Sequence, residues 1–247
     1  MGESGIGNVV TDESTVTTGE EMKQRTVVSW SSGKDSAWML HYLQQRDDLE
    51  LVALVTTFNA AFDRVAMHGV RRSLVEAQAI AAGLPLWDVP LPWPCTNEEY
   101  ESCMRAVIER ARSEGITQFA FGDLFLEDIR AYRVAQLAGT GIDPIFPIWG
   151  TRADTPALAR AMIDAGLRAV LTCVDPRRLS PSFAGRSFDE NLLADLPADV
   201  DHCGENGEFH TFCHAGPMFA TPIAISVGDV IERDGFHFAD VKSLGRS

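Results

Sequence analysis

The sequence lacks several features that mark common classes of protein. Its five cysteines are odd in number and contain no C-x-x-C pair, which does not fit a disulfide framework. No run reaches the roughly 18 apolar residues of a membrane span, and the N-terminus lacks the basic and apolar regions of a signal peptide. These absences predict a protein of the reducing cytoplasm with no membrane association.

Positive charge is scarce as well. The 247 residues include 21 lysines and arginines against 35 aspartates and glutamates, which gives a formal net charge of −14. Such a surface repels phosphate backbones, and nucleic acid is therefore disfavoured as a partner. Any site for a phosphate group must be built locally from a few residues.

What is present is an alternation of β-prone and amphipathic segments. Strands are expected at 26–29, 51–57, 86–89 and 119–121, and helices at 37–45, 68–82 and 97–113. Strands separated by helices of this length imply right-handed crossovers and a Rossmann-like, mainly parallel sheet with helices on both faces. The predicted fold class is therefore α/β, in which ligands bind at the carboxyl ends of the strands.

Three regions are expected along the chain. Residues 1–23 are rich in Gly, Thr, Ser and Glu without periodicity, which predicts a disordered tail. Residues 24–148 form the expected nucleotide-binding domain, whose end is marked by a Pro-rich segment. A smaller C-terminal α/β domain over 149–247 is expected to contain a helix at 155–165, a strand at 169–174 and short β-like pieces at 222–241.

The turn after the first expected strand has the composition of an anion site. It reads Ser31-Ser32-Gly33-Lys34-Asp35-Ser36, in which small residues let the backbone approach a ligand and the following helix offers free N–H groups. The lysine adds a positive charge and the three serines add hydroxyl donors. The structural alternative is a plain polar turn in which Asp35 or Ser36 caps the helix.

Two familiar nucleotide-binding loops do not fit this turn. A Walker A loop needs glycine five positions before Gly33 and Ser or Thr directly after the lysine, but Val28 and Asp35 occupy those places. The dinucleotide pattern G-x-G-x-x-G is also absent from the turn, which argues against NAD or FAD.

The segment instead resembles the PP-loop, S-G-G-x-D-S, of the N-type ATP pyrophosphatases, with Ser32 in place of the first glycine. The resemblance implies a HUP-type α/β domain that grips the pyrophosphate part of ATP while a substrate oxygen attacks the α-phosphorus. AMP is then transferred and pyrophosphate leaves. The residues expected to hold ATP are Ser31, Ser32, Gly33, Lys34, Asp35, Ser36, Thr56, His68, Gly122, Asp123 and Arg130.

Two further segments narrow the resemblance. Phe121-Gly122-Asp123-Leu124 closes the fourth expected strand, and residues 203–211 contain the pattern G-E-x-G-E-[FY]-H-T. Together with the PP-loop, these segments resemble the diphthine-ammonia ligase family over residues 26–220. Other landmarks that fit are Met67-His68, Arg130, Pro147-Ile148-Trp149 and Gly185-Arg186.

The resemblance implies ATP-driven amide formation. A small-molecule or protein-borne carboxylate would be adenylated, and ammonia would then displace AMP. Lys34 and the loop would stabilise charge on the α-phosphate and on the leaving pyrophosphate. Mg²⁺, bound directly or through water by Asp35 and Asp123, would neutralise the remaining charge.

A second cluster of chemical groups lies in the expected C-terminal domain. Glu205, Glu208 and His210 place two carboxylates and an imidazole within six positions, so with Lys34 they are the expected catalytic residues. They would orient ammonium or take its proton as the nucleophile forms. The structural alternative is a Gly-flanked turn whose carboxylates cap backbone amides.

Other interpretations of single residues stay open. His202, Cys203, His210, Cys213 and His214 crowd together and could bind zinc, although their spacing matches no common structural zinc pattern. His68 either lies at the mouth of the site or begins a helix. Arg130 and Arg133 could contact a phosphate or carboxylate, or could belong to a solvated helix face.

The sequence also departs from part of the family. Archaeal and eukaryotic members often carry glutamate after the Arg-Val pair, where this chain has Ala135. Residues 121–130 resemble bacterial members instead, and because bacteria lack diphthamide, a carboxylate other than diphthine is an open alternative.

Two rival functions are considered. One is a tRNA-thiolating PP-loop enzyme, whose paired cysteines and basic additions are missing here, and the other is an ATP-binding sensor. A homodimer is one possible assembly.

Overall fold

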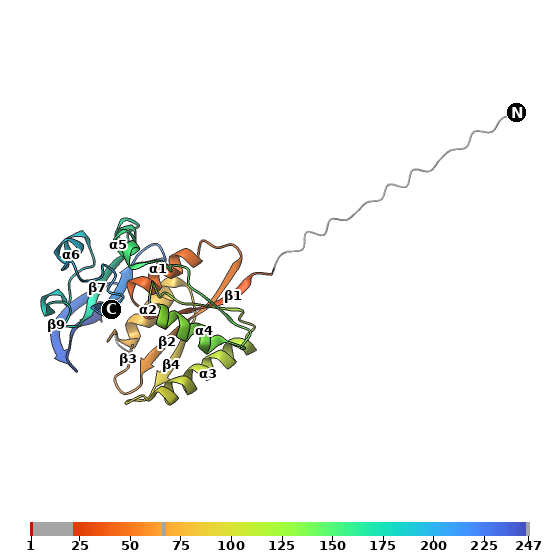
Figure 1. The fold of residues 1–247 in the computed structure, drawn as a ribbon, viewed down its shortest axis with the longest axis horizontal. Helices are drawn as coiled ribbons and strands as arrows, with labels where there is room; N and C mark the ends of the chain where they lie inside the picture. Colours follow the sequence, from red (N-terminus) through yellow and green to blue (C-terminus); the bar gives the residue numbers. More distant parts are fainter. Residues whose placement is uncertain (2–21, 66–67, 246–247) are drawn as a thin grey trace.

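The computed structural model describes Met1, residues 22–65 and residues 68–245. The tail predicted for residues 1–23 lies almost entirely outside these ranges, and so does the landmark Met67. Two sheets make up the described chain, and Figure 1 places helices α1 and α2 between them.

The first sheet is parallel apart from one short strand. Its parallel strands have the spatial order β4-β2-β1-β5-β6, and β3 pairs antiparallel with the end of β2. The bounds are β1 Gln24–Ser29, β2 Leu49–Asn59, β3 Arg64–Val65, β4 Leu86–Leu91, β5 Gln118–Ala120 and β6 Asp143–Ile145. This arrangement confirms the predicted α/β class with a mostly parallel sheet.

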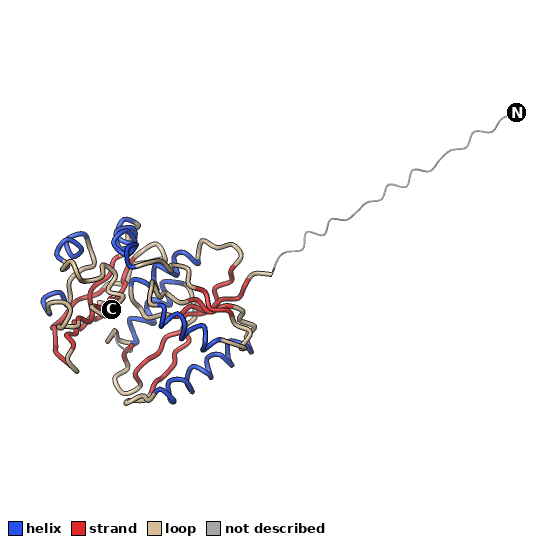
Figure 2. The backbone as a smooth tube through the Cα atoms, in the orientation of Figure 1, coloured by secondary structure: helices blue, strands red, loops and turns tan. Residues whose placement is uncertain are grey.

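Helices cover both faces of this sheet, as Figure 2 shows. They are α1 Lys34–Leu43, α2 Arg72–Ala82, α3 Asn97–Ser113 and α4 Glu127–Leu137. Side chains alternate between the two faces along a strand, so neighbours on β1 join different cores. Val27 packs in the cluster that contains Val107 of α3, whereas Val28 joins the cluster that contains Leu40 of α1.

The second sheet is antiparallel and has the order β8-β7-β10-β9. Its elements are α5 Thr155–Asp164, β7 Arg168–Val174, α6 Glu190–Asp195, β8 Phe209–Ala215, β9 Ile225–Arg233 and β10 Phe236–Ser243, with short 3₁₀ turns at Arg152–Asp154 and Pro181–Phe183. Phe212 of β8 and Ala239 of β10 share the core of α1 and α2. The second sheet therefore packs onto the helices that flank the PP-loop, while the boundary near residue 148 stays a prediction.

Several elements differ from the sequence expectation. The helix expected at 68–82 begins only at Arg72, so His68 lies in a turn before it. Helix α4 had no predicted bounds, although a helix face was one of the alternatives for Arg130 and Arg133. The expected short pieces at 222–241 are two long strands, β9 and β10, joined by the turn Asp234-Gly235, in which both residues have positive φ.

Candidate active site

The site lies where the strand order of the parallel sheet reverses. Strand β1 is flanked by β2 on one side and by β5 on the other, and ligands of open α/β sheets bind at the carboxyl ends of the strands beside such a point. The PP-loop follows β1, and Gly122 follows β5. A Cβ on Gly122 would lie 3.4 Å from the backbone of Asp35 and Ser36, so the two loops are in contact there.

A cavity of about 230 Å³ opens at this point. Its described lining residues are Ser29, Ser31, Lys34, Asp35, Ser36, His68, Gly122, Asp123, Arg133, Cys203, Gly204, Glu205, Phe209, His210 and Thr211. The lining combines the PP-loop, the loop after β5 and the Gly-Glu segment before β8. The structure thus brings together side chains that are far apart in sequence and belong to both sheets.

Strand β8 of the second sheet fixes the backbone of the PP-loop. Thr211 Oγ1 accepts a hydrogen bond from Lys34 N at 3.0 Å, and Cys213 N donates to Ser32 O at 2.9 Å. Ser32 is buried and has φ 70°, a conformation that favours glycine. A Cβ on Gly33 would lie 3.0 Å from the His68 ring, so the contact with His68 leaves little room for any other residue there.

A buried glutamine extends this support. Gln78 of α2 donates from Nε2 to Ser32 O at 3.0 Å and to Cys213 O at 2.6 Å. Its Oε1 accepts from Trp30 Nε1 at 2.8 Å. One side chain therefore ties α2 to the strand end, the PP-loop and β8, and buried polar groups of this kind are costly to leave unpaired.

We expect Gln78→Leu to lower the free energy of unfolding by about 2–4 kcal/mol, because three buried polar groups lose their partner. Urea denaturation measures the change. The matched control is Gln45→Leu in the exposed turn after α1, which should stay within about 0.5 kcal/mol of the parent. Equal unfolding midpoints for Gln78→Leu and the parent would show that this network does not stabilise the loop.

Lys34 is held in a buried ion pair. Its side chain is only 2% exposed, and Nζ donates to both carboxylate oxygens of Asp35, at 3.0 and 2.8 Å, and to Cys203 O. Burial acts most strongly and lowers the pKa of Lys34, but the charge and hydrogen bonds of Asp35, together with Cys203 and Glu205, outweigh it and raise that pKa above its ordinary value. Lys34 therefore supplies a fixed positive charge at the cavity wall.

Glu205 links the second sheet to the loop after β5. Its Oε1 accepts a hydrogen bond from Leu124 N at 2.7 Å. Burial, followed by the negative charge of Asp35, raises the pKa of Glu205 to about 8. A carboxyl group in this range changes its protonation state near neutral pH, as a general acid or base requires.

Asp123 and Arg133 face each other with unused hydrogen-bonding capacity. The distance from Arg133 Nε to Asp123 Oδ2 is 3.8 Å, and both atoms are buried with no hydrogen-bond partner among the described residues. Burial also raises the pKa of Asp123. Unsatisfied buried atoms beside a cavity point to a ligand that completes their contacts.

Two histidines stack at the cavity wall. The rings of His68 and His210 lie 4.6 Å apart, and burial lowers their pKa values to about 4 and about 3. Both imidazoles are therefore neutral at pH 7. Because the Thr211 carbonyl can only accept, its 3.2 Å contact places the proton of His68 on Nδ1.

Five of the expected site residues do not line this cavity. Ser32 and Gly33 form the loop backbone beneath it. Thr56 Oγ1 donates to Trp30 O at 2.8 Å. Glu208 is buried, and its Oε1 accepts from Asp201 N and Asn206 Nδ2. Arg130 stacks on Trp149 with a guanidinium-to-ring distance of 4.8 Å. Arg133, which lines the cavity, was not among the residues expected to hold ATP, and Thr211, Cys203 and Gln78 were not expected as contacts of the loop.

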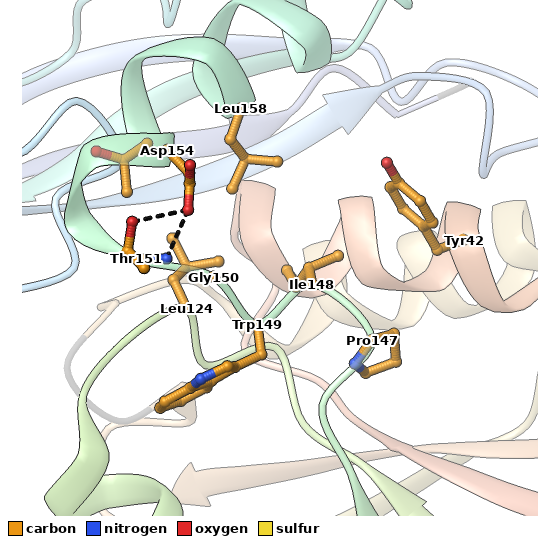
Figure 3. Close-up of a pocket in the computed structure, with 10 residues that line it drawn as sticks. Tyr42, Leu124, Pro147, Ile148, Trp149, Gly150, Thr151, Asp154 and Leu158 are labelled. Atoms are coloured by element: carbon orange, nitrogen blue, oxygen red, sulfur yellow. Dashed lines mark hydrogen bonds between the residues drawn. The ribbon is translucent and has the colours of Figure 1, made fainter.

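Leu124, whose N–H binds Glu205, lines a second cavity of about 260 Å³, shown in Figure 3. Tyr42 of α1 and the landmark 147–149 line it. The carbonyl of Leu124 accepts from Gly150 N at 2.8 Å, and its N–H is the donor to Glu205. The position of Glu205 is therefore connected to the packing of this second cavity.

The zinc alternative has no geometric support. Among the residues that the structure describes, no three His, Cys, Asp or Glu side chains are placed to share one metal ion. The cysteines and histidines at 202–214 consequently do not gather into a zinc site.

In the same described part of the chain, no helix has the length and apolar character needed to cross a membrane.

The parallel sheet, the cavity at its switch point and the buried lysine within the PP-loop fit an α/β enzyme of the PP-loop ATP pyrophosphatase class. Residues 24–138 match the family model described as the diphthamide synthase N-terminal domain, and residues 154–242 match the diphthamide synthase C-terminal domain. The chain therefore belongs to the diphthamide synthase family.

Curated relatives agree with this assignment. A diphthine–ammonia ligase of Danio rerio is 29% identical over 244 residues, which cover 89% of this chain and 93% of the relative. The protein of that name from Bos taurus is 27% identical over 164 residues, covering 63% of this chain and 59% of the relative. The one from Homo sapiens is 28% identical over 159 residues, covering 61% and 57%.

Proposed function

We propose that this chain converts an organic carboxylate into its amide, with ATP cleaved to AMP and pyrophosphate and ammonia as the nitrogen source. One observation carries the proposal: Glu205, with a pKa of about 8, lines the same cavity as the PP-loop. A site that only bound ATP would have no need of a titratable carboxyl group from the second sheet. The name of the relatives supports the same reaction class.

In the first half-reaction, a carboxylate oxygen of the substrate attacks the α-phosphorus and the bond to pyrophosphate breaks. Negative charge then builds on the leaving group, and Lys34 lies where the loop can present positive charge to it. The hydroxyls of Ser31 and Ser36, which lie 3.2 Å apart, and the first turn of α1 offer further donors. Preorganised groups of this kind stabilise developing charge without reorganisation.

The donor set of the cavity fits Mg²⁺. This ion usually keeps several waters and is held by one or two carboxylates together with substrate phosphates. Asp35 and Asp123 are the carboxylates proposed to hold it, and the unpartnered Asp123 Oδ2 supports that role. The bound ion would neutralise charge on the phosphates.

In the second half-reaction, the nitrogen of ammonia attacks the activated carbonyl carbon, the bond to AMP breaks and nitrogen loses a proton. Glu205 is the proposed acceptor of that proton. His210 lies in the same cavity, but its pKa of about 3 makes it too weak a base to hold the proton at pH 7. The His68–His210 pair is instead proposed to offer neutral hydrogen-bonding groups to the nucleophile or substrate.

The test supplies the purified protein with ATP, MgCl₂, ammonium and a panel of carboxylic acids labelled with ¹⁸O in the carboxylate. We expect AMP and pyrophosphate in equal amounts with the amide, and one ¹⁸O atom in AMP, because the attacking oxygen leaves with the phosphate. ADP and inorganic phosphate as products would overturn the proposal. AMP without ¹⁸O would overturn the adenylation step.

Two finer assignments accompany this function. Both a small acid and an acid carried on a protein are proposed as substrate classes, and diphthine, named in the relatives, belongs in the panel. A homodimer in the cytoplasm remains the proposed setting. A thiolating enzyme would instead consume ATP in response to tRNA, so tRNA in place of the acid is the discriminating addition.

A further inference from the structure

A third opening lies at the same edge of the parallel sheet as the active cavity. It has a volume of about 230 Å³ and is formed by the turn between β2 and β3, the segment after β4 and the β9–β10 hairpin. We call it the aromatic cleft, because Phe62, Trp93, Phe236 and Phe238 line it, together with Arg233. None of these residues has a role in the function proposed above.

Two of the four aromatic side chains of the cleft are exposed, and the other two, Phe236 and Phe238, are half-buried. Phe62 is 48% exposed and Trp93 is 57% exposed, and their rings meet edge to face with centroids 5.7 Å apart. Single exposed aromatics are common, but several of them gathered around a concave opening mark a ligand or interaction site. The volume is below the roughly 300–1,000 Å³ of a whole-ligand pocket, so it suits one ring system of a larger molecule.

Arg233 gives the cleft its charge. Its guanidinium lies 4.7 Å from the Phe238 ring and 5.6 Å from the Phe62 ring. Within the described ranges it forms no ion pair, whereas Arg64 on the same cleft is paired with Asp240 at 3.1 Å. Asp234 also lines the opening, but its side chain is exposed at the hairpin turn. A planar guanidinium held against rings selects a planar, negatively charged ligand.

The cleft and the active cavity are direct neighbours. His68 lines the active cavity and the next residue, Gly69, lines the cleft. Cys173 of β7 lines the cleft, and its register partner on β8 is His210 of the active cavity. One turn and one strand pair therefore separate the two openings, and a single extended molecule can reach both.

We infer that the aromatic cleft binds the ring system of the acid substrate, and that this substrate is an aromatic acid with a second anionic group on or beside its ring. The reacting carboxylate would enter the active cavity, the ring would pack against the exposed surfaces of Phe62 and Trp93, and the second anion would meet Arg233. This inference rests on the proposed function, because it names the class of acid that the ligase consumes.

The test measures binding of 2-naphthoate to the full chain by titration calorimetry, with the single carboxylate of this probe standing for the anionic group that meets Arg233. We expect Trp93→Ala and Arg233→Met each to raise the Kd about tenfold, and neutral 2-naphthamide to bind about tenfold more weakly than the acid. Arg110→Met is the matched control, because Arg110 also stacks on a ring, that of Trp87 at 3.9 Å, outside the cleft. It should bind 2-naphthoate like the parent.

A competition experiment decides whether the aromatic cleft binds the ring of the acid or the adenine ring of ATP. A non-hydrolysable ATP analogue should leave the Kd of 2-naphthoate within about threefold, and displacement by the analogue would overturn the inference. Unchanged binding in Arg233→Met and Trp93→Ala would overturn it too. The ¹⁸O experiment does not use 2-naphthoate, so a chain that labels AMP but fails these tests refutes the cleft alone. A chain that passes them but releases ADP refutes the proposed reaction alone.

Discussion

Lys34→Ala is expected to lower kcat/KM for ATP about 10²–10³-fold, the usual effect of removing one preorganised charge from a site where negative charge develops. The reason is specific to its position. Nζ is fixed by Asp35 and Cys203 O rather than by solvent, so its charge is held at one place in the cavity wall, and an uncharged replacement removes that charge. Initial rates of pyrophosphate release against ATP concentration measure the effect.

The same change also affects the fold, and the experiment must separate the two. Removing one partner of a buried ion pair typically costs about 3–5 kcal/mol, so rates are compared at a temperature where circular dichroism shows the variant folded. Lys23→Ala, at an exposed position just before β1, is the control and should keep the parent rate. A folded Lys34→Ala protein with ATP turnover within about threefold of the parent would refute the role of this lysine.

The location of the PP-loop was predictable because its signal is local. A β-prone run, six small or charged residues and an amphipathic helix follow one another in sequence, and each favours its structure independently of the rest. The contacts that hold the loop have no such signal. Thr211 and Gln78 reach it only because β8 and α2 pack against α1 in the folded chain, and no spacing in the sequence indicates this packing.

Helix α4 explains why the sequence did not identify Arg133 as the arginine that lines the cavity. Only Leu137 of its residues is buried, so the apolar stripe that marks an amphipathic helix is missing. Without that stripe, the face of each arginine cannot be assigned from the sequence. In the structure Arg133 faces Asp123 and the cavity, whereas Arg130 stacks on Trp149.

The β-like pieces expected at 222–241 did not predict the length and pairing of the β9–β10 hairpin, for a different reason. Strand β9 is largely exposed on both faces, so its sequence does not alternate as a half-buried strand does. A usable signal was present in Asp234-Gly235, since Asp-Gly between two β-prone runs favours a tight hairpin. Arg233 and Phe236 of this hairpin line the aromatic cleft, which therefore cannot be predicted without the pairing of β9 with β10.

Local spacing likewise could not separate Glu205 from Glu208. Gly204 and Gly207 have φ values of 70° and 83°, a conformation that reverses the chain direction within a few residues. As a result Glu205 faces the cavity, while Glu208 turns back to Asp201 N. The two carboxylates of the cluster therefore have different surroundings, and only one of them lies beside the PP-loop.

Glu205→Gln is expected to lower the rate of amide formation about 10²–10³-fold, the range of a lost general base. Glutamine keeps an oxygen for the Leu124 N–H, so the backbone contact survives. ATP binding should be preserved, because the phosphate loop is unchanged. Isothermal titration with a non-hydrolysable ATP analogue and the rate of amide release measure the two effects separately.

The pH dependence identifies the base. Glu205 is neutral below its pKa of about 8 and becomes a carboxylate above it, so the rate in the parent should rise as pH increases through about 8. Ammonium also loses its proton in the alkaline range, and hydroxylamine, a weaker base that is already neutral at pH 7, removes this ambiguity. With hydroxylamine the rise should persist in the parent and vanish in Glu205→Gln.

Glu208→Gln provides the closest comparison, because it makes the same change three residues away in a side chain that does not line the cavity. It should keep the pH-dependent rise with hydroxylamine, whatever its effect on the overall rate through the position of Asp201. If the rise instead vanished in Glu208→Gln and survived in Glu205→Gln, the proton would pass to Glu208. The two variants together therefore decide which carboxylate accepts the proton.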